Sequence, residues 1–147
     1  MPQRTPKVIL VIVLAALMAA VLPACAPAVD ASGLHMMPMD ELPTEVQSAP
    51  APVRTAYQFA AANPDVMEDL PCYCGCGGIG HTSNHDCYVA EVAANGKIRF
   101  DGHALGCSIC VDITLDAMRL LKDGKSVPEI RAYVDATYSR YGTSNMD

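Results

Sequence analysis

Two stretches of the chain place apolar residues with the spacing of an amphipathic helix. The first begins near residue 53 and ends before Asn63-Pro64, and the second begins near residue 108 and stops at Gly124. The positions on the two faces are Val53, Ala56, Tyr57, Ala60 and Ala61, and then Val111, Leu115, Met118 and Leu121. Because these positions are three or four residues apart, the pattern predicts a helix in each stretch.

A third helix is predicted near the C-terminus, where its boundaries are marked. Ser126 and Glu129 form a capping box, and Pro128 falls in the first turn, where its missing N–H is harmless. Gly142 supplies a stop. The face is lined by Val127, Ile130, Val134, Thr137, Tyr138 and Tyr141. Asp112 and Asp116 share a face of the preceding helix and are interpreted as solvent-facing.

Between these helices the pattern is less regular. A short turn through Val66, Met67 and Leu70 leads to a loop that is rich in cysteine and glycine. Residues 88–92 and 97–100, on either side of Asn95-Gly96, predict a short hairpin or an irregular excursion. The expected fold is therefore mainly α: a small helical domain with cysteine-rich loops and one short β-hairpin.

The first 24 residues have the pattern of a secretory signal. Arg4 and Lys7 precede an unbroken run of fifteen apolar residues, which is short for a spanning helix of about 20 residues. Leu22-Pro23-Ala24-Cys25 resembles the bacterial lipobox, in which a peptidase cuts before a lipidated cysteine. We expect a lipoprotein signal peptide over residues 1–24 and an extracytoplasmic protein anchored to the bacterial cell membrane through lipid on Cys25. The alternative is an uncleaved anchor helix.

Residues 25–52 are rich in alanine and proline and are predicted to form a tether below a folded domain at residues 53–147. His35, Met36, Met37 and Met39 lie within it. Thioether and imidazole groups suit Cu(I), but methionines also fill gaps on apolar surfaces, and the second interpretation is slightly favoured.

Composition and charge exclude one class of partner and indicate a small hydrophobic core. The formal net charge is −6, and loss of Arg4 and Lys7 with the signal would lower it by two, to −8. An acidic body with scattered basic residues argues against nucleic acid as a partner. With no tryptophan and two phenylalanines, the core is modest, so metal or disulfide cross-links would help it.

Three cysteines lie within five residues of each other, at Cys72, Cys74 and Cys76. Cysteines two apart are poor disulfide partners, whereas the glycines around them allow the backbone to curl. Such a loop can point its three sulfurs at one centre, as a soft metal ion requires.

A second group of candidate ligands follows downstream. Cys107 and Cys110 lie one turn apart at the start of a predicted helix, where the helix dipole favours thiolate. Cys87 is the sixth thiol of the mature chain. His81 and His103 are the nearest nitrogen candidates, whereas His85 is the weaker one.

Several functions are compatible with six exported thiols. Three disulfides would make a stapled interaction module, and Cys107 with Cys110 would serve a thiol–disulfide redox protein. Zinc is possible, but six thiols exceed one tetrahedral shell. Cu(I), with several ions sharing sulfurs, fits the thiolates best, and a copper donor or acceptor protein would be the partner. No catalytic serine–histidine–acid set, phosphate loop or carboxylate pair is present, so we expect a binding protein and not an enzyme.

These motifs together resemble the bacterial PCYCGC-motif lipoprotein family. The residues that carry the resemblance, over roughly residues 42–141, are Pro71-Cys72-Tyr73-Cys74-Gly75-Cys76, Gly80-His81, Asp86-Cys87, residues 106–113 and residues 129–134. The resemblance implies a secreted, lipid-anchored protein. It implies no activity, so the expectation of copper rests on the ligands themselves.

Overall fold

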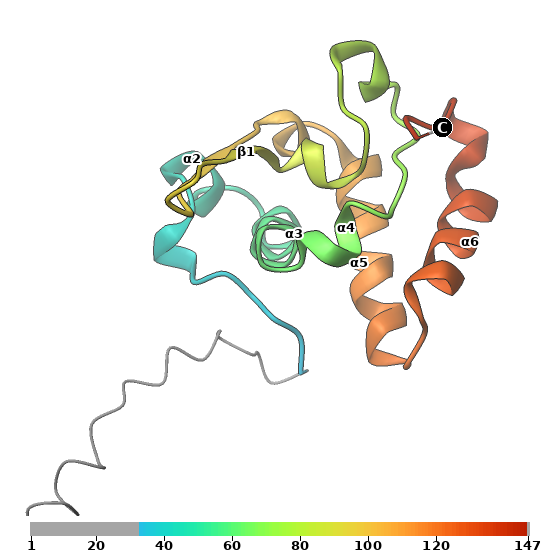
Figure 1. The fold of residues 1–147 in the computed structure, drawn as a ribbon, viewed down its shortest axis with the longest axis horizontal. Coiled ribbons are helices and arrows are strands. Elements are labelled where there is room, and N and C mark those ends of the chain that lie inside the picture. The colour runs from blue at the N-terminus through green and yellow to red at the C-terminus, as the bar shows by residue number, and fades with distance from the viewer. Residues whose placement is uncertain (1–32, 147) are drawn as a thin grey trace, which may run out of the picture.

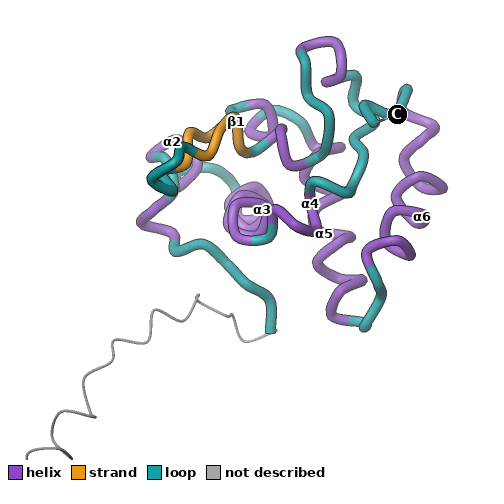
Figure 2. The backbone as a smooth tube through the Cα atoms, in the orientation of Figure 1, coloured by secondary structure: helices purple, strands orange, loops and turns teal. Residues whose placement is uncertain are grey.

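The structure, a computed structural model, describes residues 33–146 (Figure 1). Its α-helices are α2 (Thr44–Gln47), α3 (Ala51–Ala62), α4 (Pro64–Met67), α5 (Ser108–Lys122) and α6 (Val127–Tyr138). Its strands are β1 (Val89–Val92) and β2 (Ile98–Phe100), and short 3-10 turns join the elements (Figure 2). The prediction of a small, mainly α-helical domain with one hairpin is confirmed. The predicted signal peptide and Cys25 lie outside the described residues.

The segment before α3 is folded against the rest of the domain. Leu34, Leu42 and Val46 are buried in the core. The backbone N–H of Met37 donates to the carbonyl of Gln58 at 2.9 Å, and the Gln58 side chain donates to the carbonyl of Met37 at 2.8 Å. The tether predicted over residues 25–52 therefore differs from the structure from Leu34 onwards.

The prolines explain this difference. Pro38, Pro43 and Pro50 directly precede the turn η1 (Met39–Glu41), α2 and α3, as their N-cap residues. A fixed φ is compatible with entry into a helix as well as with extended chain. The prolines therefore divide the segment into short turns, and the apolar residues between them reach the core.

Helices α3 and α5 pack against each other and form the centre of the domain. On α3, Ala56, Tyr57, Phe59 and Ala60 are buried. On α5 the buried face is wider than predicted, because α5 also packs against α6: it comprises Cys110, Val111, Ile113, Thr114, Ala117, Met118 and Leu120. Leu115 and Leu121, which the apolar spacing placed on the helix face, are only half-buried.

The predicted start of α6 is confirmed, whereas its end is earlier than predicted: α6 ends at Tyr138, and the 3-10 turn η5 (Ser139–Tyr141) leads to Gly142. The Ser126 hydroxyl and the Glu129 carboxylate form the reciprocal capping box. Ile130, Val134 and Tyr138 are buried. The Tyr138 hydroxyl donates to Asp116 of α5 at 2.8 Å, so Asp116 is half-buried and its prediction as solvent-facing is wrong.

The hairpin is antiparallel and irregular. Val89 pairs with Phe100, Glu91 with Arg99 and Val92 with Ile98, and the register shifts between Val89 and Glu91. Gly96, with a φ of 80°, makes the turn. Within residues 33–146 no helix is long and apolar enough to cross a membrane.

Candidate metal centre

The loop after α4 carries three of the cysteines and curls back on itself. Gly75 has a φ of 86°, in the left-handed region that favours glycine. It redirects the chain between Cys74 and Cys76, where the 3-10 turn η2 (Cys76–Ile79) begins. Cys72 and Cys76 are thereby buried, while Cys74 stays half-buried.

Three further segments bring the remaining candidate ligands to this loop. Cys87 ends the 3-10 turn η3 (His85–Cys87), and His103 begins the turn η4 (His103–Leu105). Cys107 is the N-cap residue of α5, and Cys110 lies in its first turn. All six cysteines of the described chain are free thiols.

The sulfurs converge on one place. Those of Cys72, Cys74 and Cys110 form a triangle with sides of 3.4, 3.5 and 3.6 Å. The Cys87 and Cys76 sulfurs are 3.7 Å apart. With metal–sulfur bonds of about 2.3 Å, two sulfurs of a tetrahedral shell lie about 3.8 Å apart. The spacing is therefore close to that of a metal shell.

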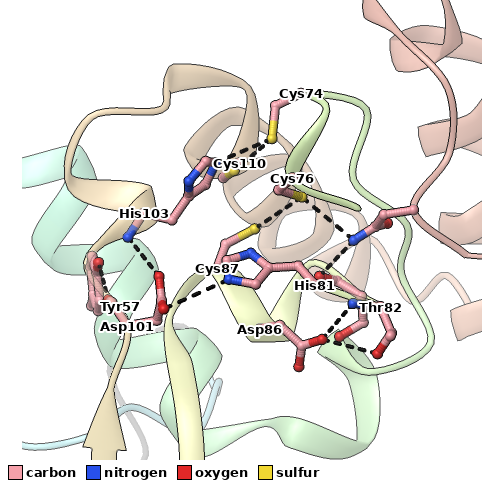
Figure 3. A network of polar contacts seen from close by, with 12 residues as sticks. Tyr57, Cys74, Cys76, His81, Thr82, Asp86, Cys87, Asp101, His103 and Cys110 are labelled. Atoms are coloured by element: carbon pink, nitrogen blue, oxygen red, sulfur yellow. Dashed lines mark hydrogen bonds and ion pairs between the residues drawn. The ribbon is translucent and has the colours of Figure 1, made fainter. Parts of the chain in front are cut away.

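The candidate ligands fall into two groups. Within each group, all ligand atoms lie within 4.8 Å of one another. One group comprises Cys74, His103, Cys107 and Cys110, and the other comprises Cys72, Cys76 and Cys87. Figure 3 shows Cys74 in contact with His103 and Cys110, and Cys87 in contact with Cys76. All six predicted cysteines are thus brought together, in two groups that could hold a metal ion.

The two predicted histidine ligands take different positions. The Nε2 atom of His103 lies 3.3 Å from the Cys74 sulfur. His81 belongs to neither group, although its ring lies 5.3 Å from that of His103. Its Nε2 atom is 3.7 Å from the Asp101 carboxylate, and its Nδ1 atom is buried without a hydrogen-bond partner among the described residues. Sequence alone did not separate these two histidines.

Asp101 is a residue of the site that the sequence did not indicate. Its Oδ1 atom accepts the backbone N–H of His103 at 2.7 Å, while its Oδ2 atom faces His81. The Tyr57 hydroxyl donates to the Asp101 carbonyl at 2.7 Å (Figure 3). Carboxylates that hold histidines in place are typical of metal sites.

The other histidines and the N-terminal methionines lie outside both groups. His85 is buried, with its Nδ1 atom 3.9 Å from Glu68, and burial lowers its pKa. His35 is exposed. Met36, Met37 and Met39 are half-buried and pack against the core, in accordance with their interpretation as gap-filling residues.

Hydrogen bonding and burial shift the pKa values of the thiols in different directions. The contact between Cys72 and Cys110 lowers the pKa of Cys72 and raises that of Cys110. Burial raises the pKa values of Cys74 and Cys76. A thiolate is the form that binds metal, so an ion would have to displace protons from the remaining thiols.

The C-terminal tail closes over the cysteine loop. The Asn145 side chain accepts the N–H of Cys72 at 2.6 Å and donates to the carbonyl of Ser83 at 3.0 Å and to the Cys76 sulfur at 3.6 Å. Nothing in the sequence around Asn145 marks this role. The tail therefore orients two of the buried cysteines.

A buried network of hydrogen bonds holds the Cys110 end of the cysteine cluster in place. The Tyr88 hydroxyl donates to the carbonyl of Cys110 at 2.8 Å, and the Thr114 hydroxyl donates to the Tyr88 oxygen at 2.8 Å. The side-chain Nδ2 of Asn84 donates to the same Cys110 carbonyl at 3.5 Å. Since buried polar groups are costly to leave unpaired, these bonds fix the first turn of α5 and with it Cys110.

Comparison with known proteins identifies a family but no characterised relative. The model of a family described as "Protein of unknown function with PCYCGC motif" matches residues 33–145. No curated protein and no solved structure matches the chain. The match spans the folded segment before α3, all six cysteines and Asn145. The chain therefore belongs to the PCYCGC-motif family.

Proposed function

We propose that this protein binds a soft metal ion, Cu(I) foremost, through its six cysteines outside the cytoplasm. The observation that carries the proposal is the triangle of sulfurs of Cys72, Cys74 and Cys110, with sides of 3.4 to 3.6 Å. These three thiols come from two segments that are far apart in the sequence, and the fold itself does not require their sulfurs to be in contact. They are the donor set that a thiophilic ion takes.

Copper is favoured over zinc by the number and kind of ligands. A structural zinc site takes four ligands, and six thiols and a histidine exceed that number. Thiolate ligands favour Cu(I), zinc and iron–sulfur clusters over the other first-row metals. Zinc remains compatible with the group of Cys74, His103, Cys107 and Cys110, which has three sulfurs and one nitrogen.

The two other readings of the cysteines have less support. Structural staples would be paired and distributed over the domain, whereas these six thiols are free and gathered in one cluster. A redox protein that uses Cys107 and Cys110 needs only those two thiols, and the convergence of the other four would have no purpose. We therefore propose a binding protein and not an enzyme.

The location is proposed from the N-terminal sequence. Residues 1–24 form a lipoprotein signal, and lipid on Cys25 holds the mature protein on the outer side of the cell membrane. Exchange of copper with a donor or acceptor protein then takes place there. Oxidation threatens free thiols outside the cytoplasm, and bound metal protects them.

The test is Cu(I) binding measured against a competing chelator under anaerobic conditions. Loss of a residue that hydrogen-bonds to a metal ligand typically lowers metal affinity by about 10- to 100-fold. We expect Cys74→Ser and Cys110→Ser each to lower Cu(I) affinity by more than this, because a hard hydroxyl replaces a soft thiolate. Ser108→Ala, at an exposed position beside the cluster, is the matched control and should bind as the wild type does.

Each alternative has its own outcome in this experiment. Equal affinity of wild type and Cys74→Ser would contradict a shared copper site. Loss of disulfide exchange in Cys107→Ser without loss of metal binding would favour the redox protein. Metal should also raise the melting temperature, because only the folded chain assembles the ligands.

A further inference from the structure

We infer that the six thiols form two linked metal sites, an inner one that retains its ion and an outer one that exchanges it. The inner site comprises Cys72, Cys76 and Cys87, and the outer site comprises Cys74, His103, Cys107 and Cys110. This inference rests on the proposed function and assigns a different role in metal binding to each of the two sites. The division follows from donor chemistry, from burial and from the fact that, within each group, all ligand atoms lie within 4.8 Å of one another.

The two sites offer different donor sets. The inner site is made of sulfur alone, which suits Cu(I) and disfavours harder ions. The outer site adds the imidazole of His103 to three sulfurs, and four ligands of this kind also suit a tetrahedral Zn²⁺ or Co²⁺ ion. The outer site should therefore accept a wider range of ions than the inner site does.

The two sites also differ in burial, and the inner site is the more buried one. The exposed fractions of Cys72, Cys76 and Cys87 are 0, 2 and 0%. In the outer site Cys74, His103 and Cys107 are half-buried, and only Cys110 is fully buried. Cys107 also lines a surface pocket of about 330 Å³ together with Val53 and Leu105. A thiol- or thioether-bearing carrier can therefore approach Cys107 but cannot reach the inner sulfurs.

A short sulfur path joins the two sites. The Cys72 sulfur of the inner site lies 3.4 Å from the Cys74 sulfur and 3.5 Å from the Cys110 sulfur, both in the outer site. An ion can exchange one thiolate for the next over such a distance without being released. No oxidation is involved, because the ion keeps its charge and each thiolate is replaced by another. The outer site is thus the route by which the inner site fills and empties.

The first test uses the full chain with all six site cysteines intact. Cys25→Ser, which removes the seventh thiol, is the common background of every variant, and this parent protein is called wild type below. It is loaded with Cu(I) under anaerobic conditions. We expect two copper ions per chain. An excess of Cu(I) chelator should remove them in two phases of equal amplitude, the fast phase from the outer site.

Substitutions assign the phases. His103→Gln and Cys107→Ser should abolish the fast phase and keep one ion, whereas Cys87→Ser should abolish the slow phase. Co²⁺ provides a second readout, because its sulfur charge-transfer absorption should survive Cys87→Ser and be lost in Cys107→Ser. His35→Gln changes an exposed histidine outside both sites and should keep both phases.

Two results would overturn the division. One is single-phase removal of copper from the wild type, and the other is loss of the same ions in His103→Gln and Cys87→Ser. Either result would leave the proposed copper binding intact, as one undivided cluster. A wild type that binds no Cu(I) would instead contradict the proposed function. If Cys87→Ser fails to fold, the wild-type kinetics still decide between the two cases.

Discussion

Asn145 holds the peptide of Cys72 from both sides, although the two residues are 73 positions apart. Its side-chain Oδ1 atom accepts the Cys72 N–H at 2.6 Å, and its backbone N–H donates to the Cys72 carbonyl at 3.1 Å. One backbone and one side-chain hydrogen bond therefore tie the C-terminal tail to the cysteine loop. This contact ties the position of the buried sulfurs to a segment that contributes no ligand.

Replacement of Asn145 by alanine should loosen the buried ligands. The Cys72 N–H and the Ser83 carbonyl would lose their partners, at a cost of about 1–3 kcal/mol in the free energy of unfolding of the metal-free protein. Cu(I) affinity should fall by about 10- to 100-fold, as is typical when a residue that orients ligands is lost. Chemical denaturation and chelator competition measure the two effects. Thr143→Ala, at an exposed position of the same tail, is the control; equal affinity of both variants would contradict this role of Asn145.

The tail also approaches the loop closely at Gly142. A β-carbon at this position would lie 2.7 Å from the carbonyl oxygen of Tyr73, so Gly142→Ala should push the tail away from the loop. We expect a loss of about 1–3 kcal/mol in the free energy of unfolding, the usual cost of overpacking. Gly78→Ala is the matched control, because a β-carbon there meets no atom within 4 Å. If both variants unfold at the same denaturant concentration, the close contact does not matter for stability.

The capping box of α6 should make stability depend on pH in the acid range. The N–H and the hydroxyl of Ser126, and the ammonium group of Lys125, lower the pKa of Glu129 from 4.5 to about 2. A lowered pKa in the folded state stabilises the protein above pH 4.5, and this contribution is lost as the pH falls from 4.5 through about 2. The difference in melting temperature between wild type and Glu129→Gln should therefore be constant at neutral pH, shrink as the pH falls below 4.5 and vanish below about pH 2.

The control for this measurement is Glu45→Gln, which changes an exposed carboxylate of α2. It should melt as the wild type does at every pH. A difference between wild type and Glu129→Gln that persists unchanged to the acid end would show that the carboxylate charge is not what stabilises the cap.

Lipid on Cys25 should account for attachment to the membrane. Within residues 33–146 no helix is long and apolar enough to cross a bilayer. Under the proposed location, lipid on Cys25 is the anchor. We expect Cys25→Ser to be mis-processed or released, and fractionation followed by a salt wash measures this. Retention of the Cys25→Ser protein in the washed membranes would identify residues 8–22 as an uncleaved anchor helix.

The sequence by itself determined the elements whose signals are local. The capping box of Ser126 and Glu129 defined the start of α6, and the apolar spacing predicted α3 and α5. The glycine turn at Asn95-Gly96 predicted the hairpin. The donor set was also readable, because three cysteines separated by single residues cannot easily pair with each other.

Only the tertiary structure decided which ligands share a site. The sequence could not divide the six cysteines into two groups, since Cys72 meets Cys110 through the packing of α5 under the loop. It could not distinguish His103 from His81, because their positions depend on Asp101 and on the turns around it. The roles of Asn145 and Leu34 were equally hidden, because both act through contacts with residues far along the chain. Such contacts arise from the burial of the whole domain and leave no periodic signal in the local sequence.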